Sequence, residues 1–171
     1  MITVQQLHAL GVSNSNSLLF IAPLNDTLER YNINTKLRIC HFLAQVLHES
    51  NCFLWETELS SGKQYEHRAD LGNTHEGDGV KYKGRGTIQI TGRDNYTVLS
   101  HVFHEDFLTH PELLATPKWA TLSAGWFWDN RHLNLFADKD DLTTITHRIN
   151  GGENGLADRR KYLEKCKQII L

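Results

Sequence analysis

Six stretches of the chain carry apolar residues at helical spacing or residues that start and stop helices. They are TVQQLHALG (3–11), SNSNSLLFIAPLNDTLERYN (13–32), NTKLRICHFLAQVLHES (34–50), TPKWATLSAGWFWDNRH (116–132), DLTTITHRIN (141–150) and GLADRRKYLEKCKQII (155–170). Gly11 ends the first stretch, and Asn34 or Thr35 can cap the third. These patterns predict a mainly α-helical fold.

The stretch 34–50 is apolar almost all the way around its helix, which is the pattern of a buried central helix. In the stretch 116–132, Trp119 and Trp126 are seven residues apart and share a helix face, which favours core packing over contact with a ligand. The basic run RRKYLEKCK (159–167) is interpreted as a solvated helix face.

Residues 55–96 are polar and rich in glycine, and they show little periodicity. Only TIQIT (87–91) alternates, which predicts a short strand with Gln89 and Thr91 on one face and the two isoleucines on the other. Because a long irregular segment inside a compact domain is often functional, we expect a site in this region.

Length and composition narrow the class of protein. The 171 residues suit a single domain over residues 1–171, without a linker or internal repeat. A net charge of −2 and the lack of a long basic run argue against nucleic acid as a partner. The apolar run SLLFIAPL (17–24) is too short to span a bilayer, so we expect no stable membrane insertion, and a monomer is the default expectation.

Cysteine usage and the N-terminus bear on the compartment. Cys40, Cys52 and Cys166 are odd in number, which favours free thiols in a chain that folds in a reducing compartment. The first ten residues lack the cationic start and apolar middle of a secretory signal. We therefore expect synthesis in the cytoplasm.

Glu49 is the most informative carboxylate because it ends the stretch predicted to be most buried. Desolvation and the negative end of the helix dipole are both expected to raise its pKa. A carboxyl that stays protonated near neutral pH can act as a general acid. The alternative is a helix-end glutamate that faces water or pairs with an arginine.

Glycoside hydrolysis requires a second carboxylate facing the first. On one continuous helix Glu58 would lie half a turn out of phase with Glu49, so the chain must turn after residue 50 if the two are to share a substrate. A separation of roughly 6.5–9.5 Å would leave space for a water molecule and imply inversion. Glu56 and Glu66 are alternative partners, although each is expected to pair with a cation such as Arg68.

The motif KGRGTIQITGRDNY (83–96), together with FLAQVLHES (42–50) before it and RINGG (148–152) after it, resembles glycoside hydrolase family 19. This family comprises chitinases and related phage endolysins. The resemblance spans residues 40–152 in the family's order, and it implies a lysozyme-like α-helical domain with a small β element and a substrate cleft. The single domain expected here has no separate wall-binding module, and in this it resembles the endolysins of phages that infect Gram-negative hosts.

The resemblance assigns roles by motif position. Glu49 matches the general acid, Glu58 matches the general base, and Thr91 stands where many plant members have a serine that helps to hold the attacking water. Gln89 and Asn95 match residues of the cleft that contact the sugar.

Further positions are assigned to the same cleft less directly. Asn150 matches an asparagine that lines the cleft, and Arg85 lies between two glycines that allow close backbone approach. Trp55 is the best candidate for stacking on a sugar. Tyr82 and Tyr96 are expected to contact the substrate, with plain packing as the alternative.

The resemblance predicts an endolysin-type glycosidase (a muramidase) that hydrolyses β-1,4 bonds of bacterial peptidoglycan by an inverting mechanism. The segment 55–74 is shorter than its plant counterpart and lacks its cysteines, as in the phage and bacterial branch. Such an enzyme would reach the periplasm after release through the inner membrane. A chitinase acting on chitin oligosaccharides and an inactive glycan-binding protein are the alternatives.

No cofactor or metal is expected. HES (48–50) is not the H-E-x-x-H zinc motif, because Cys52 stands at the position of the second histidine. His41 and His48 are two helical turns apart, but a metal site would require further ligands that converge on them.

Overall fold

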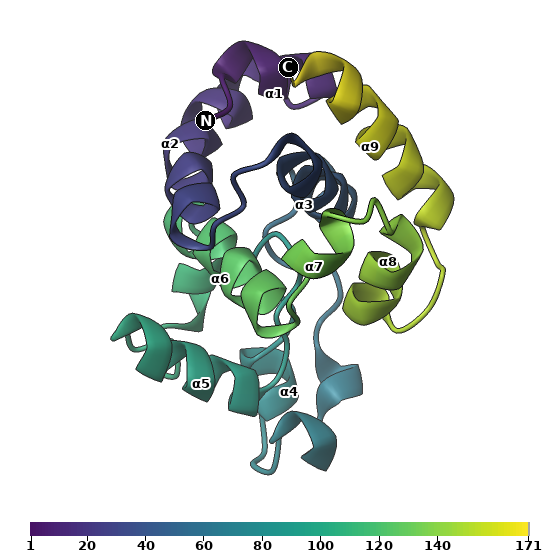
Figure 1. Ribbon diagram of the computed structural model, residues 1–171. Coiled ribbons are helices and arrows are strands. Elements are labelled where there is room, and N and C mark those ends of the chain that lie inside the picture. Colours follow the sequence, from purple (N-terminus) through teal and green to yellow (C-terminus); the bar gives the residue numbers. More distant parts are fainter. Residues whose placement is uncertain (171) are drawn as a thin grey trace.

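The computed structural model describes residues 1–170, whose regular structure is helical apart from two isolated β-bridges. The α-helices are α1 (Val4–Leu10), α2 (Asn14–Arg30), α3 (Lys36–Glu49), α4 (Asp78–Lys81), α5 (Arg93–Phe103), α6 (Pro117–Asn130), α7 (Asn134–Ala137), α8 (Leu142–Asn150) and α9 (Leu156–Ile169), and the 3-10 helices are Lys63–Tyr65, Ala69–Leu71 and Pro111–Ala115. Each of the six predicted helices lies inside its predicted stretch (Figure 1). No helix within residues 1–170 is both long enough and apolar enough to cross a membrane.

The first three helices begin at polar caps. The Thr3, Ser13 and Thr35 hydroxyls each accept a hydrogen bond from a backbone N–H in the first turn of α1, α2 and α3, respectively. These contacts satisfy donors that a helix start would otherwise leave free. Gly11 ends α1 in the left-handed conformation at φ 111°, where a residue with a side chain would be strained.

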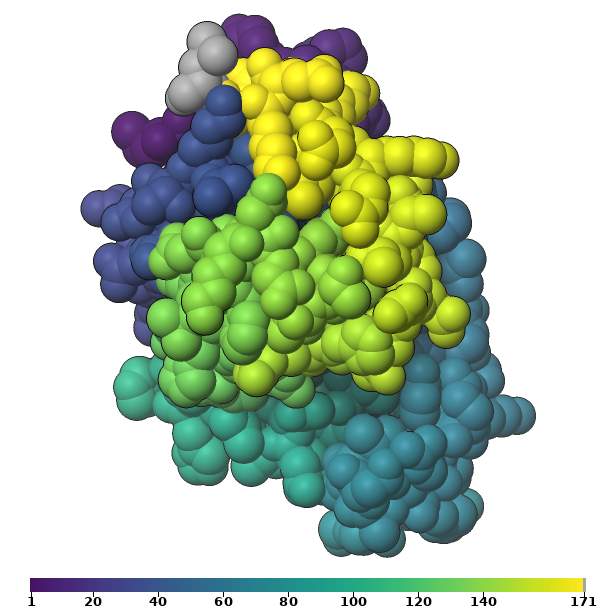
Figure 2. All heavy atoms as spheres, turned by 45° about the vertical axis from the view of Figure 1, so that its right-hand side comes forward, coloured from purple at the N-terminus to yellow at the C-terminus, as the bar shows by residue number. Residues whose placement is uncertain are grey.

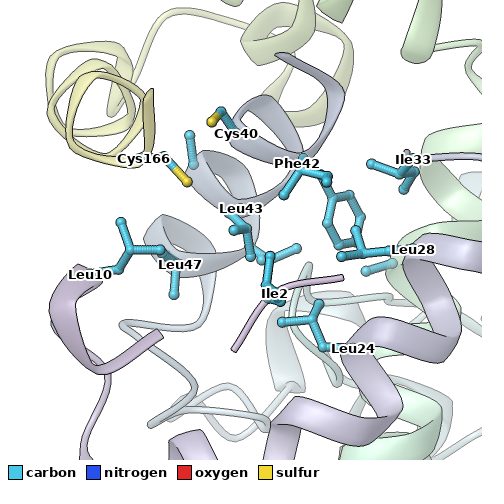
Figure 3. Packing of buried hydrophobic residues seen from close by; sticks show 14 of the residues in the cluster. Ile2, Leu10, Leu24, Leu28, Ile33, Cys40, Phe42, Leu43, Leu47 and Cys166 are labelled. Atoms are coloured by element: carbon cyan, nitrogen blue, oxygen red, sulfur yellow. The ribbon is translucent and has the colours of Figure 1, made fainter. Parts of the chain in front are cut away.

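Helix α3 lies at the centre of the molecule, as predicted, with α1, α2, α6, α7, α8 and α9 around it (Figure 1). Every residue from Ile39 to Leu47 on this helix is buried. In Figure 3, Phe42, Leu43 and Leu47 of α3 pack among apolar side chains from the N-terminal helices and α9. Burial on all sides fixes both the direction of α3 and the place where it ends.

A second apolar cluster holds the segments outside this helical shell. It contains Tyr82, Tyr96, Phe103 and Phe107, with Trp119 packed against the two phenylalanines at 5.4 Å between ring centroids. Trp126 packs partly buried against the same cluster. The core packing predicted for the two tryptophans is therefore confirmed. Figure 2 shows the segments of this small lobe (residues 55–115), in blue and teal, beneath the green and yellow helices.

The prediction of a strand at residues 87–91 is wrong. Gly86 and Gln89 both have left-handed backbone, at φ 80° and 56°, and the N–H of Ile90 donates to the carbonyl of Arg85 at 2.8 Å. The segment is therefore a tight turn, and the predicted alternation of faces fails because it requires extended backbone. The small β element consists of two bridges, which pair Arg85 with Thr57 and with Ile90.

Candidate active site

A cleft of about 540 Å³ opens where the C-terminal end of α3 meets the small lobe. Its walls come from both parts of the molecule, and they bring together residues that lie far apart in the sequence. The lining residues are Glu49, Trp55, Glu58, Leu59, Ser60, Gln64, Tyr65, Gln89 and Thr91. Five predicted site residues thus share one cavity, namely Glu49, Trp55, Glu58, Gln89 and Thr91.

The chain reverses directly after Glu49, as the second carboxylate requires. Residues 51–53 are all left-handed, with φ of 49°, 60° and 58°, and none of them is glycine. This conformation costs roughly 1–2 kcal/mol per residue. Compensating contacts hold it: the Ser50 hydroxyl accepts from the N–H of Phe53 at 2.9 Å, and the Phe53 ring stacks on Phe20 at 4.6 Å. Asn16 also donates to the carbonyl of Phe53 at 2.7 Å.

Glu49 pairs with a buried arginine, Arg159, and pairing with an arginine was one of the alternatives stated for this helix-end glutamate. The Arg159 guanidinium, 1% exposed, donates to Oε1 of Glu49 and also to the carbonyl of Asn154 at 2.6 Å. The Glu49 side chain is 21% exposed, and its Oε2 has no hydrogen-bond partner within residues 1–170. Glu49 thus lines the cleft with one oxygen fixed by Arg159 and the other without a partner among the described residues.

Glu58 is held by three hydrogen-bond donors. Its Oε1 accepts from the Ser60 hydroxyl and from Gln64 Nε2 (3.1 Å to Gln64), and its Oε2 accepts from the N–H of Gly84 at 2.8 Å. A carboxylate offers about four lone-pair positions. Three are occupied here, so one position on Oε2 is left for a water molecule.

Gly84 is the point at which three cleft groups converge. A Cβ added there would lie 2.7 Å from Oε2 of Glu58, 2.9 Å from Oε1 of Gln89 and 3.3 Å from the Thr91 hydroxyl oxygen. Only a glycine therefore lets the carboxylate, the amide and the hydroxyl gather around one piece of backbone. Gln89 is fixed by donating to the carbonyls of Trp55 at 3.2 Å and Gly86 at 3.0 Å.

Tyr82 and Tyr96 cannot make the predicted contacts with substrate in this structure, because both side chains are buried. Tyr82 and Tyr96 are 1% and 0% exposed, and their hydroxyls donate to the backbone carbonyls of Leu108 and Lys83, respectively. They pack in the core of the small lobe, which was the alternative for both. Arg85 also turns inward, since it donates to the Tyr96 hydroxyl at 2.9 Å.

Two predicted asparagines lie outside the set of residues that line the cleft. Asn95 donates to the carbonyl of Thr91 at 2.7 Å, so it supports the turn that carries a cleft residue. Asn150 is exposed and donates to the carbonyl of Asn154 at 3.0 Å, the same carbonyl that Arg159 contacts. Contact of either side chain with a ligand stays a prediction.

The alternative carboxylates have other surroundings. Glu66 accepts from the N–H groups of Gly77 and Gly79, and Arg68 pairs with Asp70 instead, so the predicted pairing with Arg68 is wrong for both glutamates. Both carboxyl oxygens of Glu56 are buried without a hydrogen-bond partner within residues 1–170. This burial raises the pKa of Glu56 to about 8.

Three contributors to the site were absent from the sequence analysis: Arg159, Ser60 and Gln64. Arg159 belongs to a run that was interpreted as a solvated face, and this interpretation is wrong for that residue because its side chain is buried against α3. In a run of charged residues, the sequence pattern does not show which charged side chain is buried. Ser60 and Gln64 lie in an irregular segment whose pattern carries no signal, although their closeness in sequence to Glu58 could have suggested them.

The histidines do not form a metal centre. His41 contacts Asp140 at 2.8 Å, whereas His48 contacts Asp158 at 2.7 Å at the other end of α3. Across the described residues, no group of three or more His, Cys, Asp or Glu side chains is placed to hold a metal ion.

No family model matches the chain. A glycosyl hydrolase family 19 domain-containing protein of Haemophilus influenzae is 38% identical over 105 residues, which make up 61% of this chain and 50% of that protein. An endochitinase of Arabidopsis thaliana is 34% identical over 142 residues, which make up 78% of this chain and 48% of that protein. The chain thus spans about half the length of the curated relatives that it matches.

Solved structures show the same fold. A bacterial family 19 chitinase superimposes with a TM-score of 0.80 at 19% identity, over 98% of this chain and 94% of that chain. Chitinase C from Streptomyces griseus gives a TM-score of 0.79 at 20% identity, over 98% of this chain and 76% of that chain. The predicted mainly α, lysozyme-like architecture with a small β element is confirmed.

Proposed function

Because the chain belongs to glycoside hydrolase family 19, by homology to its curated relatives and by its fold, we propose that it hydrolyses β-1,4 bonds between N-acetylated amino sugars. The observation that carries this proposal is the pair of carboxylates in one cleft. Glu49 enters from the buried central helix, and Glu58 enters from the small lobe opposite the turn at residues 51–53. The two occupy different environments, as an acid and a base require.

The chemistry assigned to this pair is a single displacement. Glu49 gives a proton from Oε2 to the departing glycosidic oxygen, while Glu58 takes a proton from a water molecule through its remaining lone pair. The Thr91 hydroxyl lies beside the same Gly84 backbone as Glu58, so it can hold that water. The water attacks the anomeric carbon from the face opposite the leaving group, and the configuration is inverted.

Among substrates we place bacterial peptidoglycan first. The short, cysteine-free segment 55–74, which supplies the base and much of the cleft wall, resembles the compact phage and bacterial branch of the family. On this proposal the enzyme meets its substrate in the cell wall, outside the compartment in which it is made. Chitin is the second candidate, because several relatives and neighbours bear the name endochitinase or chitinase.

The test compares the wild type with Glu49→Gln and Glu58→Gln on purified peptidoglycan and on colloidal chitin. Each variant is expected to lose roughly 10²–10⁴-fold in the rate of release of reducing ends, with an unchanged circular dichroism spectrum. Glu112→Gln is the matched control, because that side chain is 68% exposed and lies outside the cleft lining.

The outcomes separate the candidates. Mass spectrometry of the soluble products identifies the new reducing sugar and hence the bond that is cut. Turnover of chitin without turnover of peptidoglycan would reverse the order of substrates. Binding of either glycan by the wild type without any turnover would leave only the inactive glycan-binding protein. Near wild-type rates for Glu49→Gln would refute the assignment of the acid.

A further inference from the structure

Helices α3 and α9 pack against each other, and the end of α3 lies beside the start of α9, so the two run in antiparallel directions. At one end of their contact, His48 pairs with Asp158 at 2.7 Å and Glu49 pairs with Arg159. Cys40 lies eight residues before His48 on α3, and Cys166 lies eight residues after Asp158 on α9. Eight residues are about 2.2 turns, and positions i and i+8 belong to the same broad stripe of a helix, so the two cysteines fall on the same side of each helix as the ion pairs.

The side chains confirm this register. Cys40 and Cys166 are both 0% exposed members of the main core cluster. Figure 3 shows the two sulfur atoms in the gap between the helices, each directed toward the other helix. Cys52 is different, because its sulfur lies 3.1 Å from the hydroxyl of Tyr162 and it has no thiol partner among the described residues.

We propose that Cys40 and Cys166 form a disulfide that crosslinks α3 to α9 when the chain folds in the presence of a disulfide-class oxidant. The two thiols lose two protons and two electrons as the sulfur–sulfur bond forms. The oxidant takes up the electrons and its own disulfide is reduced to two thiols, through a mixed disulfide with one cysteine. This proposal does not rest on the proposed glycosidase activity.

The two sulfurs have different surroundings in the folded chain. The hydrogen bond with Cys166 lowers the pKa of Cys40, burial partly opposes this, and the positive charges of Lys36 and Lys167 lower it further. The hydrogen bond with Cys40 and burial raise the pKa of Cys166. Because both sulfurs are buried once the chain has folded, the oxidant must react with a cysteine while the chain is still folding.

The crosslink would act on the active-site helices. It joins the far ends of the same two helices that hold Glu49 against Arg159, and it closes a loop of about 125 residues, which lowers the entropy of the unfolded chain. For a chain of this size we expect a rise in Tm of roughly 10 °C.

The experiment unfolds the chain, refolds it with reduced or oxidised glutathione, and measures intact mass and Tm under non-reducing conditions. The oxidised form is expected to be lighter by about 2 Da and to melt at higher temperature, and dithiothreitol should reverse both changes. Trypsin cannot separate Cys40 from Cys52, since no Lys or Arg lies between them. The crosslinked peptides are therefore mapped in the Cys52→Ser variant, which should still form the crosslink.

Cys40→Ala and Cys166→Ala are expected to lose the difference in Tm between the reduced and oxidised forms. Because that difference is measured within each variant, a general loss of stability from the substitution does not affect it. Three results would overturn the proposal: no loss of mass in the wild type, a crosslink that involves Cys52, or an oxidised form that is no more stable than the reduced one.

Discussion

Replacing Glu56 with glutamine should change the pH dependence of stability while leaving stability at pH 4 nearly unchanged. Both carboxyl oxygens of Glu56 are buried without a hydrogen-bond partner in the described part of the chain, and desolvation raises its pKa from 4.5 to about 8. Below pH 4.5 the group is neutral in the folded and the unfolded chain. As pH rises from 4.5 to 8, the unfolded chain releases the proton while the folded chain retains it, so folded stability falls across this window and levels off above it.

The size of the effect follows from the shift. At about 1.4 kcal/mol per pKa unit, a shift from 4.5 to about 8 corresponds to a loss of about 5 kcal/mol. Entry of water and movement of the side chain reduce the penalty of a buried charge, so we expect about 2–3 kcal/mol. For a chain of this length that is roughly 5–10 °C in Tm.

The assay is thermal unfolding of the wild type and Glu56→Gln from pH 4 to pH 9. The quantity of interest is the difference in Tm between the two proteins, because the titration of other groups cancels in it. This difference should be near zero at pH 4 and favour the variant by several degrees at pH 9. Glu76→Gln, a change at an exposed loop residue, serves as the control and should stay parallel to the wild type. If the curves for Glu56→Gln and the wild type also run parallel, the Glu56 carboxyl does not titrate in this window and the reasoning fails.

Two further substitutions test the contacts of the proposed acid and base. Arg159→Ala removes the buried partner of Glu49 and should lower the free energy of urea unfolding by about 3–5 kcal/mol. Arg159→Lys should recover only part of this stability, because lysine lacks the forked donor of arginine. A cost below 1 kcal/mol for Arg159→Ala would show that the pair is not desolvated. Gln64→Ala removes a hydrogen-bond donor to Glu58 and should lower kcat on a soluble oligosaccharide by roughly tenfold, with little change in KM. An effect on KM alone would assign Gln64 to substrate binding instead.

The helical part of the fold could be predicted because its signals are local. The apolar pattern of residues 34–50 and the Thr35 cap depend only on residues that are close in sequence. They therefore predict this helix whatever the rest of the fold is, as long as the helix is buried. The turn after Ser50 was predictable only from the requirement that two carboxylates meet. Asn51 tolerates left-handed backbone, but Cys52 and Phe53 do not favour it, so their conformation depends on contacts with Phe20 and Asn16, which are remote in sequence.

The small lobe could be predicted far less well, for a related reason. The alternation at residues 87–91 suggested a strand, but the bridges to Arg85 and the left-handed Gln89 make it a turn. Gln89 and Thr91 reach the cleft all the same, because their position is set by convergence on Gly84 rather than by strand faces. The family motif located these residues correctly even though the expected secondary structure was wrong.

The choice between Glu56 and Glu58 as the base shows what the sequence leaves undecided. The two residues are separated by a single position, and both carry the same group. Glu56 has every lone pair free, but its oxygens are sealed from solvent, so no water or sugar can reach them. Glu58 has three of about four positions occupied, yet it lines the cleft and keeps one position open beside Thr91. Access of the attacking water, and not the number of free lone pairs, therefore favours Glu58 over Glu56 as the proposed base. Since the buried Glu56 retains its proton up to about pH 8, it also adds no negative charge beside the cleft at neutral pH.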